Sequence, residues 1–80
     1  MSTKLIELNI NKGNKWVNKS IMDANIPEEI LIVMIKRKGE VLIPKGATVI
    51  EEGDILVLSG ENIEELIDKE LQKSPKEKTS

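Results

Sequence analysis

The chain has 80 residues and a formal net charge of −2, with no cysteine, no histidine and one aromatic residue, Trp16. This length allows one small domain without disulfides, and the near balance of charges argues against a nucleic-acid polymer as the partner. Without histidine or cysteine the chain lacks the usual nucleophile pairs and the imidazole and thiolate ligands, so we expect neither an enzyme nor a metal site.

The size of the chain also favours self-association. A domain this short has marginal stability, and a symmetric dimer is the simplest way to cover apolar surface that one copy leaves exposed. The longest apolar run, Ile30–Ile35, is far shorter than the roughly 20 residues that span a bilayer. The first residues lack the apolar core of a signal peptide. We therefore expect a soluble homodimer.

The first half of the chain predicts two strands and a connection between them. Lys4–Ile10 alternates apolar and polar residues, which indicates a half-buried strand. From Trp16 to Asn25 apolar residues recur at helical spacing, so we expect a short helical connection that ends before Pro27. Ile30–Ile35 is apolar on both faces, which predicts a strand that is either central in the sheet or covered by a partner subunit.

The second half predicts a hairpin and a further strand. Glu40–Ile43 has the pattern of the returning hairpin strand, and Pro44 ends it because proline cannot donate to a ladder. Val49 and Ile50 predict a brief extended piece. Ile55–Leu58 is again continuously apolar and predicts a buried strand.

The last predicted element is an amphipathic helix. Asn62 and Glu65 predict a capping box at its start, and acidic residues early with lysines late suit the helix dipole. Residues 74–80 are polar and predict a disordered tail, so the domain is expected to span residues 1–73. The abrupt start and the tail favour a fragment of a longer protein. The apolar stripe of the helix consists of Ile63, Leu66, Ile67 and Leu71.

Taken in order, these elements predict an α+β domain of the order β-X-β-β-X-β-α, with a small mixed sheet or pseudo-barrel and one C-terminal amphipathic helix. Two features allow alternative interpretations. We interpret Lys36, Arg37 and Lys38 as a charged, solvated hairpin turn, with a phosphate-binding site as the alternative. We interpret Trp16 as a core or rim anchor, with stacking on a base as the alternative.

One ordered set of motifs extends over most of the predicted domain. An apolar strand that ends near Arg37 is followed by a Pro-x-Gly-x-Thr motif, which begins at Pro44, and then by Gly53 and Asp54. This succession resembles the TrkA-C domain, which is the C-terminal half of the regulator-of-potassium-conductance (RCK) module. The segments that carry the resemblance are Asn18–Ile21, Ile26–Pro27, Ile32–Gly39, Ile43–Thr48 and Glu52–Leu58.

The resemblance implies the same order of strands and helix, pairing into homodimers, and a place on the cytoplasmic side of bacterial potassium channels, antiporters or chloride channels. A membrane-embedded domain would then be a partner. Some members of the family bind cyclic di-AMP across the dimer axis, with the adenines against apolar side chains, and no other cofactor is implied. By position, the ligand-binding residues here would be Ile21, Met22, Ile30, Leu31 and Pro44.

One departure from the family concerns the charge in front of the apolar strand. Ligand-binding relatives often have an arginine there, whereas this chain has Glu28 and Glu29. If these carboxylates pointed inward, they would disfavour a dianionic ligand. Phosphate contacts would then have to come from other residues, for which Lys19 and Lys45 are candidates.

Three functions are therefore compared. The first is a regulatory module that binds cyclic di-AMP at a symmetric dimer interface. The second is a structural module that dimerises or couples a transporter and binds no small molecule. The third treats the stretch Gly46–Ile55 as the turn of a biotinyl or lipoyl carrier, for which Lys36 and Lys38 lack the characteristic neighbours.

Overall fold

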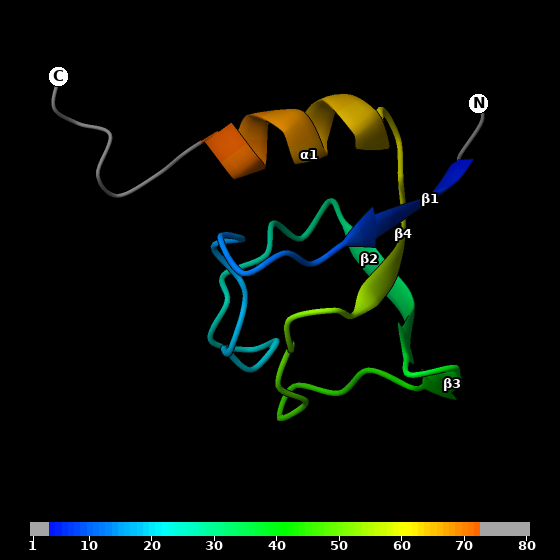
Figure 1. Cartoon of the computed structure of the whole chain (residues 1–80). Helices are drawn as coiled ribbons and strands as arrows, with labels where there is room; N and C mark the ends of the chain where they lie inside the picture. Colours follow the sequence, from blue (N-terminus) through cyan, green and yellow to red (C-terminus); the bar gives the residue numbers. More distant parts are fainter. Residues whose placement is uncertain (1–3, 73–80) are drawn as a thin grey trace, which may run out of the picture.

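The computed structural model describes residues 4–72, which form one sheet of four strands and one helix (Figure 1). The sheet has the order β1-β4-β2-β3, and all of its neighbouring strands are antiparallel. The expected α+β class is confirmed, but the expectation of a mixed sheet was wrong, because every pair of neighbouring strands within residues 4–72 is antiparallel. The elements are β1 Lys4–Asn9, β2 Leu31–Arg37, β3 Glu40–Leu42, β4 Ile55–Gly60 and α1 Ile63–Gln72.

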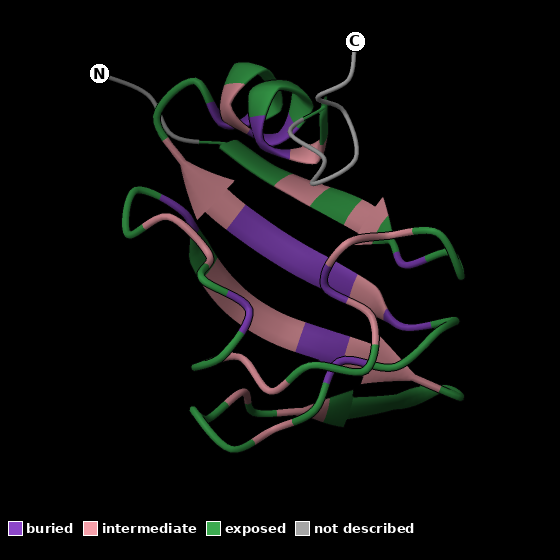
Figure 2. Ribbon diagram, turned by 90° about the vertical axis from the view of Figure 1, so that its left-hand side faces the viewer, coloured by how far each residue is buried: buried purple, intermediate pink, exposed green. Residues whose placement is uncertain are grey.

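The strands follow the predicted patterns of burial. In β1, Ile6 and Leu8 are half-buried and Glu7 is exposed, as alternation requires. In β4, which has a strand on each side, Leu56 and Leu58 are completely buried. Figure 2 shows the buried residues concentrated on this central strand.

Strand β2 is central for only part of its length. Its pairs with β3 involve only its last three residues, from Ile35 to Arg37, whereas its pairs with β4 begin at Leu31. The first half of β2 therefore has a neighbour on one side only. The prediction of a central strand is therefore confirmed for the end of β2. Coverage by a partner subunit stays a prediction for its beginning, which lies at a free edge.

The connection between β1 and β2 is not helical, so that prediction was wrong. It consists of consecutive turns, in which the N–H of Val17 donates to the Asn14 carbonyl at 3.2 Å and the N–H of Lys19 donates to the Trp16 carbonyl at 3.2 Å. Asn18 then adopts a φ of 66°, a left-handed conformation that asparagine tolerates better than most residues and that ends any helix.

Helix α1 has the predicted apolar stripe, with Ile63 and Ile67 buried, and it packs on β1 and β4. The predicted capping box is not the geometry at its start. Asn62 has a φ of 55°, outside the extended conformation in which a side chain caps a helix. The late lysine at position 73 and the expected tail, residues 74–80, lie outside the described residues.

The core lies on one face of the sheet. The helix and the connecting segments cover that face, and the opposite face is bare of described backbone (Figures 1 and 2). Trp16 is completely buried in the core, which confirms it as a core anchor. The bare face carries an ion pair between Lys36 and Glu7, with 2.6 Å between Nζ and Oε2. No helix within residues 4–72 is long and apolar enough to cross a bilayer.

Candidate functional site

The candidate site is a hollow at the free edge of β2. Strand β3 ends at Leu42, and Pro44 has no N–H with which to continue the ladder, so the chain leaves β2 at this point. The departing chain and the start of β2 enclose a hollow of about 280 Å³. Its apolar walls come from the segments before and within β2 and from the connecting turns; they are Ile21, Ile26, Pro27, Ile30, Leu31, Ile32 and Pro44.

Four of the five residues assigned by resemblance therefore share one hollow, namely Ile21, Ile30, Leu31 and Pro44. Met22 is not part of its wall. Its side chain is 64% exposed and lies against Gly46, where an added Cβ would be 3.5 Å from Met22 Cε. Met22 thus lies at the rim. The ligand-binding role of all five residues stays a prediction.

The rim carries the most exposed large apolar side chains of the described residues. Met22, Leu31 and Ile43 are 64%, 62% and 70% exposed, respectively. Isolated exposed apolar residues are common on protein surfaces and need no explanation, but a group around one hollow marks an interaction site. The free edge of β2 passes through this group.

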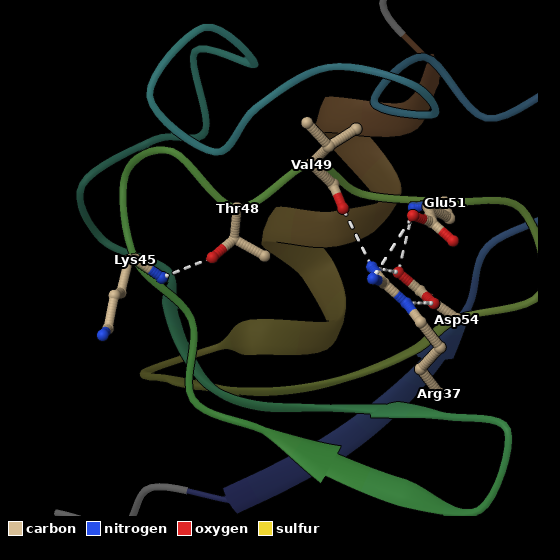
Figure 3. Close-up of polar contacts among 6 residues, drawn as sticks. All are labelled: Arg37, Lys45, Thr48, Val49, Glu51 and Asp54. Carbon is tan, nitrogen blue, oxygen red and sulfur yellow. Dashed lines mark hydrogen bonds and ion pairs between the residues drawn. The ribbon is translucent and has the colours of Figure 1, made fainter.

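Two loops form the far wall, and hydrogen bonds between backbone groups hold them together. The N–H of Ile21 donates to the Thr48 carbonyl at 2.9 Å, and the N–H of Met22 donates to the Gly46 carbonyl at 3.0 Å. The Pro-x-Gly-x-Thr motif has a local reason, because the Thr48 hydroxyl accepts the N–H of Lys45 at 3.0 Å and closes the turn (Figure 3).

The two acidic residues in front of β2 face different surroundings. Glu28 lines the hollow together with Lys45. Glu29 lines a separate hollow of about 540 Å³, with Glu61, Asn62 and Glu65. The electrostatic conflict with an anionic ligand is therefore limited to Glu28, and Lys45 lies in the same hollow to oppose it. Lys19, the other candidate for phosphate contacts, is not part of the wall.

An ion pair between the half-buried Arg37 and the buried Asp54 lies behind the loops, and sequence reasoning missed it. Arg37 Nε and Nη2 donate to the two carboxylate oxygens of Asp54, each at 2.8 Å (Figure 3). Nη2 also donates to the Val49 carbonyl at 2.8 Å, and Nη1 lies 3.3 Å from Glu51 Oε2. Such two-pronged contacts are the strongest that arginine makes with carboxylates.

This pair corrects the interpretation of the basic run. Arg37 is the last residue of β2 and points to Asp54, whereas the hairpin turn is formed by Lys38 and Gly39, which have φ angles of 50° and 79°. The signal was present in the sequence, since an arginine that ends an apolar strand and an aspartate that precedes one both lie next to buried segments.

The pair also shifts the ionisation of both partners. Burial by itself raises the pKa of Asp54, but hydrogen bonds from Arg37 and from the Glu51 N–H, with the positive charge of Arg37, lower this pKa below its usual value of 3.8. The hydrogen bond to Asp54 raises the pKa of Arg37. Both side chains are therefore charged at neutral pH.

The sequence profile of the TrkA-C domain matches residues 5–69. The chain belongs to the TrkA-C domain family. The ordered motifs around Arg37, Pro44 and Asp54 had indicated this family, and the match confirms it. Among residues 4–72 of this TrkA-C domain, no group of three or more carboxylates is arranged to hold a metal ion.

Relatives of the domain are known from sequence and from structure. The Trk system potassium uptake protein TrkA homolog of Archaeoglobus fulgidus is 37% identical over 65 residues, which cover 79% of this chain and 15% of that protein. A structure described as an RCK domain with cda is 31% identical, has a TM-score of 0.65, and is matched over 85% of this chain and 93% of that one.

A second structure shows the same fold. It is the RCK_C domain dimer of S. agalactiae BusR in complex with c-di-AMP, with a TM-score of 0.72, 22% identity, and coverage of 85% of this chain and 95% of that one. The TrkA-C domain described here thus has an RCK-type fold, and it spans a small part of the length of the TrkA homolog.

Proposed function

We propose that this TrkA-C domain is a regulatory module that binds cyclic di-AMP at a symmetric interface between two copies of the chain. The observation that carries the proposal is the apolar hollow at the free edge of β2, where Ile21, Ile30, Leu31 and Pro44 meet. An apolar cleft with few polar groups suits the flat face of an adenine base.

The volume of the hollow supports a site made from two copies. Sites for small molecules are generally about 300–1,000 Å³, and the hollow on one chain measures about 280 Å³. Two such hollows, joined across a two-fold axis, reach that range. The axis would also match the two-fold symmetry of a cyclic dinucleotide, with one base for each half-site.

The free edge of β2 supplies a seam for this dimer. Unpaired strand edges readily add another strand, and within residues 4–72 no strand pairs with the first half of β2 on the side where β3 has ended. Exposed Leu31 and Ile43 flank this edge. Dimerisation here would remove both from water and bring the two hollows close together.

The charges of the hollow suit a ligand with two phosphates. Each copy contributes one lysine, Lys45, and one carboxylate, Glu28, to its half-site. Two copies would together supply two lysines, one for each phosphate group. The exposed Glu28 is free to remain in water, where the solvent screens much of its repulsion.

The relatives suggest where such a module works. One similar structure is an RCK domain with cda, and another of the same fold is an RCK_C dimer in complex with c-di-AMP. The curated relative is a potassium uptake protein. We therefore place the domain in the cytoplasm, as part of a protein that regulates ion transport and acts on a membrane-embedded partner, in a binding rather than a catalytic role.

A second candidate function is a dimerisation or coupling module that binds no small molecule. The presence of Glu28 in the hollow favours it. Both functions require the same dimer, so the presence of a dimer does not separate them. Ligand titration does.

The test is isothermal titration with cyclic di-AMP, with the dimer confirmed by sedimentation. We expect saturable binding at one ligand per dimer, and Leu31→Glu to abolish it. The control is Leu5→Glu, because Leu5 and Leu31 are 61% and 62% exposed and pair with the same residue, Ser59, from opposite sides. No heat from a folded dimer at high ligand concentration would leave the structural module as the function. Equal loss in both variants would disprove the site.

A further inference from the structure

The Arg37 side chain joins the end of β2 to the chain that leads into the hollow. Its guanidinium lies with Asp54 on one side and the Val49 carbonyl on the other, each at 2.8 Å (Figure 3). Asp54 in turn accepts the N–H of Glu51 at 2.9 Å. Three elements of backbone therefore meet at one arginine, namely the end of β2, the loop at Val49 and the turn before β4.

Val49 is also the point at which the two loops of the hollow pair with each other. It forms an isolated antiparallel bridge with Ser20, flanked by the Ile21 N–H donating to the Thr48 carbonyl and the Ile50 N–H donating to the Lys19 carbonyl, each at 2.9 Å. In this pattern the carbonyls of Thr48 and Ile50 accept backbone N–H groups. The carbonyl of Val49 accepts the hydrogen bond from Arg37 instead.

The contacts thus form a continuous series from the ion pair to the hollow. Arg37 fixes Val49, the bridge ties Val49 to Ser20, and the next backbone bonds place Ile21 and Met22. On the other loop, the residues before Val49 include Lys45 and Gly46 of the wall. We infer that Arg37 is a positioning residue that sets the geometry of the hollow through the Val49 carbonyl. This inference rests on the proposed function in one respect, which is that the hollow is taken as the ligand site.

Arginine has chemical features that lysine lacks for this role. Its planar group has donors in a fixed fork, so that one residue holds both oxygens of Asp54 and still points a further N–H at Val49. Lysine keeps the charge but directs its donors from a single nitrogen. Arg37→Lys should therefore retain an ion pair with Asp54 and lose the defined contact with Val49.

The first experiment needs no ligand. Amide hydrogen exchange is measured on the full chain for Arg37→Lys and for the control Lys36→Met, which removes a neighbouring cation whose ion pair with Glu7 lies on the bare face of the sheet. In Arg37→Lys we expect exchange at the Ile21 and Met22 amides to be about tenfold faster or more, as for loss of a charge-assisted hydrogen bond. The ladder amides of β1 and β4 should keep their wild-type rates, and Lys36→Met should change neither group.

A second variant tests the ion pair from the side of Asp54. Because this variant also lowers global stability, its exchange rates at Ile21 and Met22 are compared with those of its own ladder amides. Asp54→Asn keeps the shape of the side chain but removes the charge that orients Arg37, so the same two amides should exchange faster, by a smaller factor than in Arg37→Lys. Equal acceleration of the ladder amides in both variants would show a purely structural role and would overturn the inference. Unchanged exchange at Ile21 and Met22 would overturn it as well.

The second experiment uses cyclic di-AMP as the probe and follows the titration of the wild type. We expect Kd to rise about tenfold or more in Arg37→Lys, at a temperature where unfolding curves show the variant to be folded, and to be unchanged in Lys36→Met. If the wild type itself gives no binding, the proposed function fails while the exchange result still decides the role of Arg37. Faster exchange with unaltered Kd would disprove its importance to the site.

Discussion

Asp54 is a carboxylate with 1% of its surface exposed, and charged side chains are almost never so buried unless they are paired. Its two oxygens receive the bonds from Arg37 and the Glu51 N–H. Removing one partner of such a pair leaves an uncompensated charge, which costs more than the pair itself contributes. The fold therefore depends on both residues being charged.

This dependence predicts an acid transition with a defined sign. Because the folded pKa of Asp54 lies below 3.8, its contribution to stability is present above the unfolded pKa and is lost as the pH falls through the folded value. We expect the urea midpoint of the wild type to fall as the pH drops below about 4. Asp54→Asn should be less stable at neutral pH and should lose less on acidification.

The matched control for the acid transition is Asp68→Asn, since Asp68 is exposed on α1. Its midpoint should follow the wild type at every pH. A pH dependence in Asp54→Asn as steep as in the wild type would show that other carboxylates cause the transition.

At the scale of single elements, patterns of apolar residues predicted all four strands and the helix. Alternation in β1 and continuous apolarity in β2 and β4 reflect local burial, which periodicity reads directly. The connection from Trp16 to Asn25 has helical spacing too, yet it forms turns. Asn18 and Asn25 both adopt positive φ, and the bridge of Ser20 with Val49 is a contact between distant residues, which local spacing does not reveal.

The helix gives a prediction about stability. Ile67 is 7% exposed and belongs to the core that α1 forms on the sheet. Ile67→Ala should lower the free energy of unfolding by about 2–5 kcal/mol, because it removes buried methyl groups and leaves a cavity. Chemical denaturation measures this change, with Asp68→Ala on the exposed side of the same helix as the control. Equal effects of the two substitutions would mean that α1 does not stabilise the domain by packing.

At the scale of the whole molecule, the open side of the domain is where β3 ends and β2 continues. One face of the sheet is covered, and the rim of the hollow leaves Met22, Leu31 and Ile43 in water. A single copy of so short a chain has marginal stability, and burial of this rim against a second copy would add to it.

The expected dimer is testable by mass action. If two copies fold and associate together, the Tm should rise with protein concentration, and sedimentation should give twice the monomer mass. Ile43→Glu should shift the mass toward the monomer, because it places a charge in the seam, whereas Val41→Glu should leave the mass unaltered. Val41 is 58% exposed, but its strand partner is Lys36, away from the hollow. A monomeric wild type with a constant Tm would exclude the seam.

The sequence predicted part of the candidate site, and the structure was needed for the rest. The apolar wall residues Ile21, Ile30, Leu31 and Pro44 were assigned from the family resemblance, and the fold brings them into one hollow. Met22 lies at the rim, and of Glu28 and Glu29 only the first reaches the hollow. Whether Glu28 or Glu29 faces the hollow depends on the turn at Pro27 and on the residue at which β2 begins. Neither of these follows from composition.

The sequence by itself determined the α+β class, the order of strands and helix, the membership in the TrkA-C family and the absence of histidine and cysteine chemistry. The class and the order of elements follow from local periodicity and turn residues, and the excluded chemistry follows from composition. The family follows from the resemblance of the ordered motifs, and none of these inferences needs knowledge of distant contacts. Only the tertiary structure decided that β4 lies between β1 and β2, that β2 keeps a half-free edge, and that Arg37 joins Asp54 to Val49. Each of these depends on contacts between residues far apart in the chain, and a free energy shared among such contacts leaves no periodic signal in the sequence.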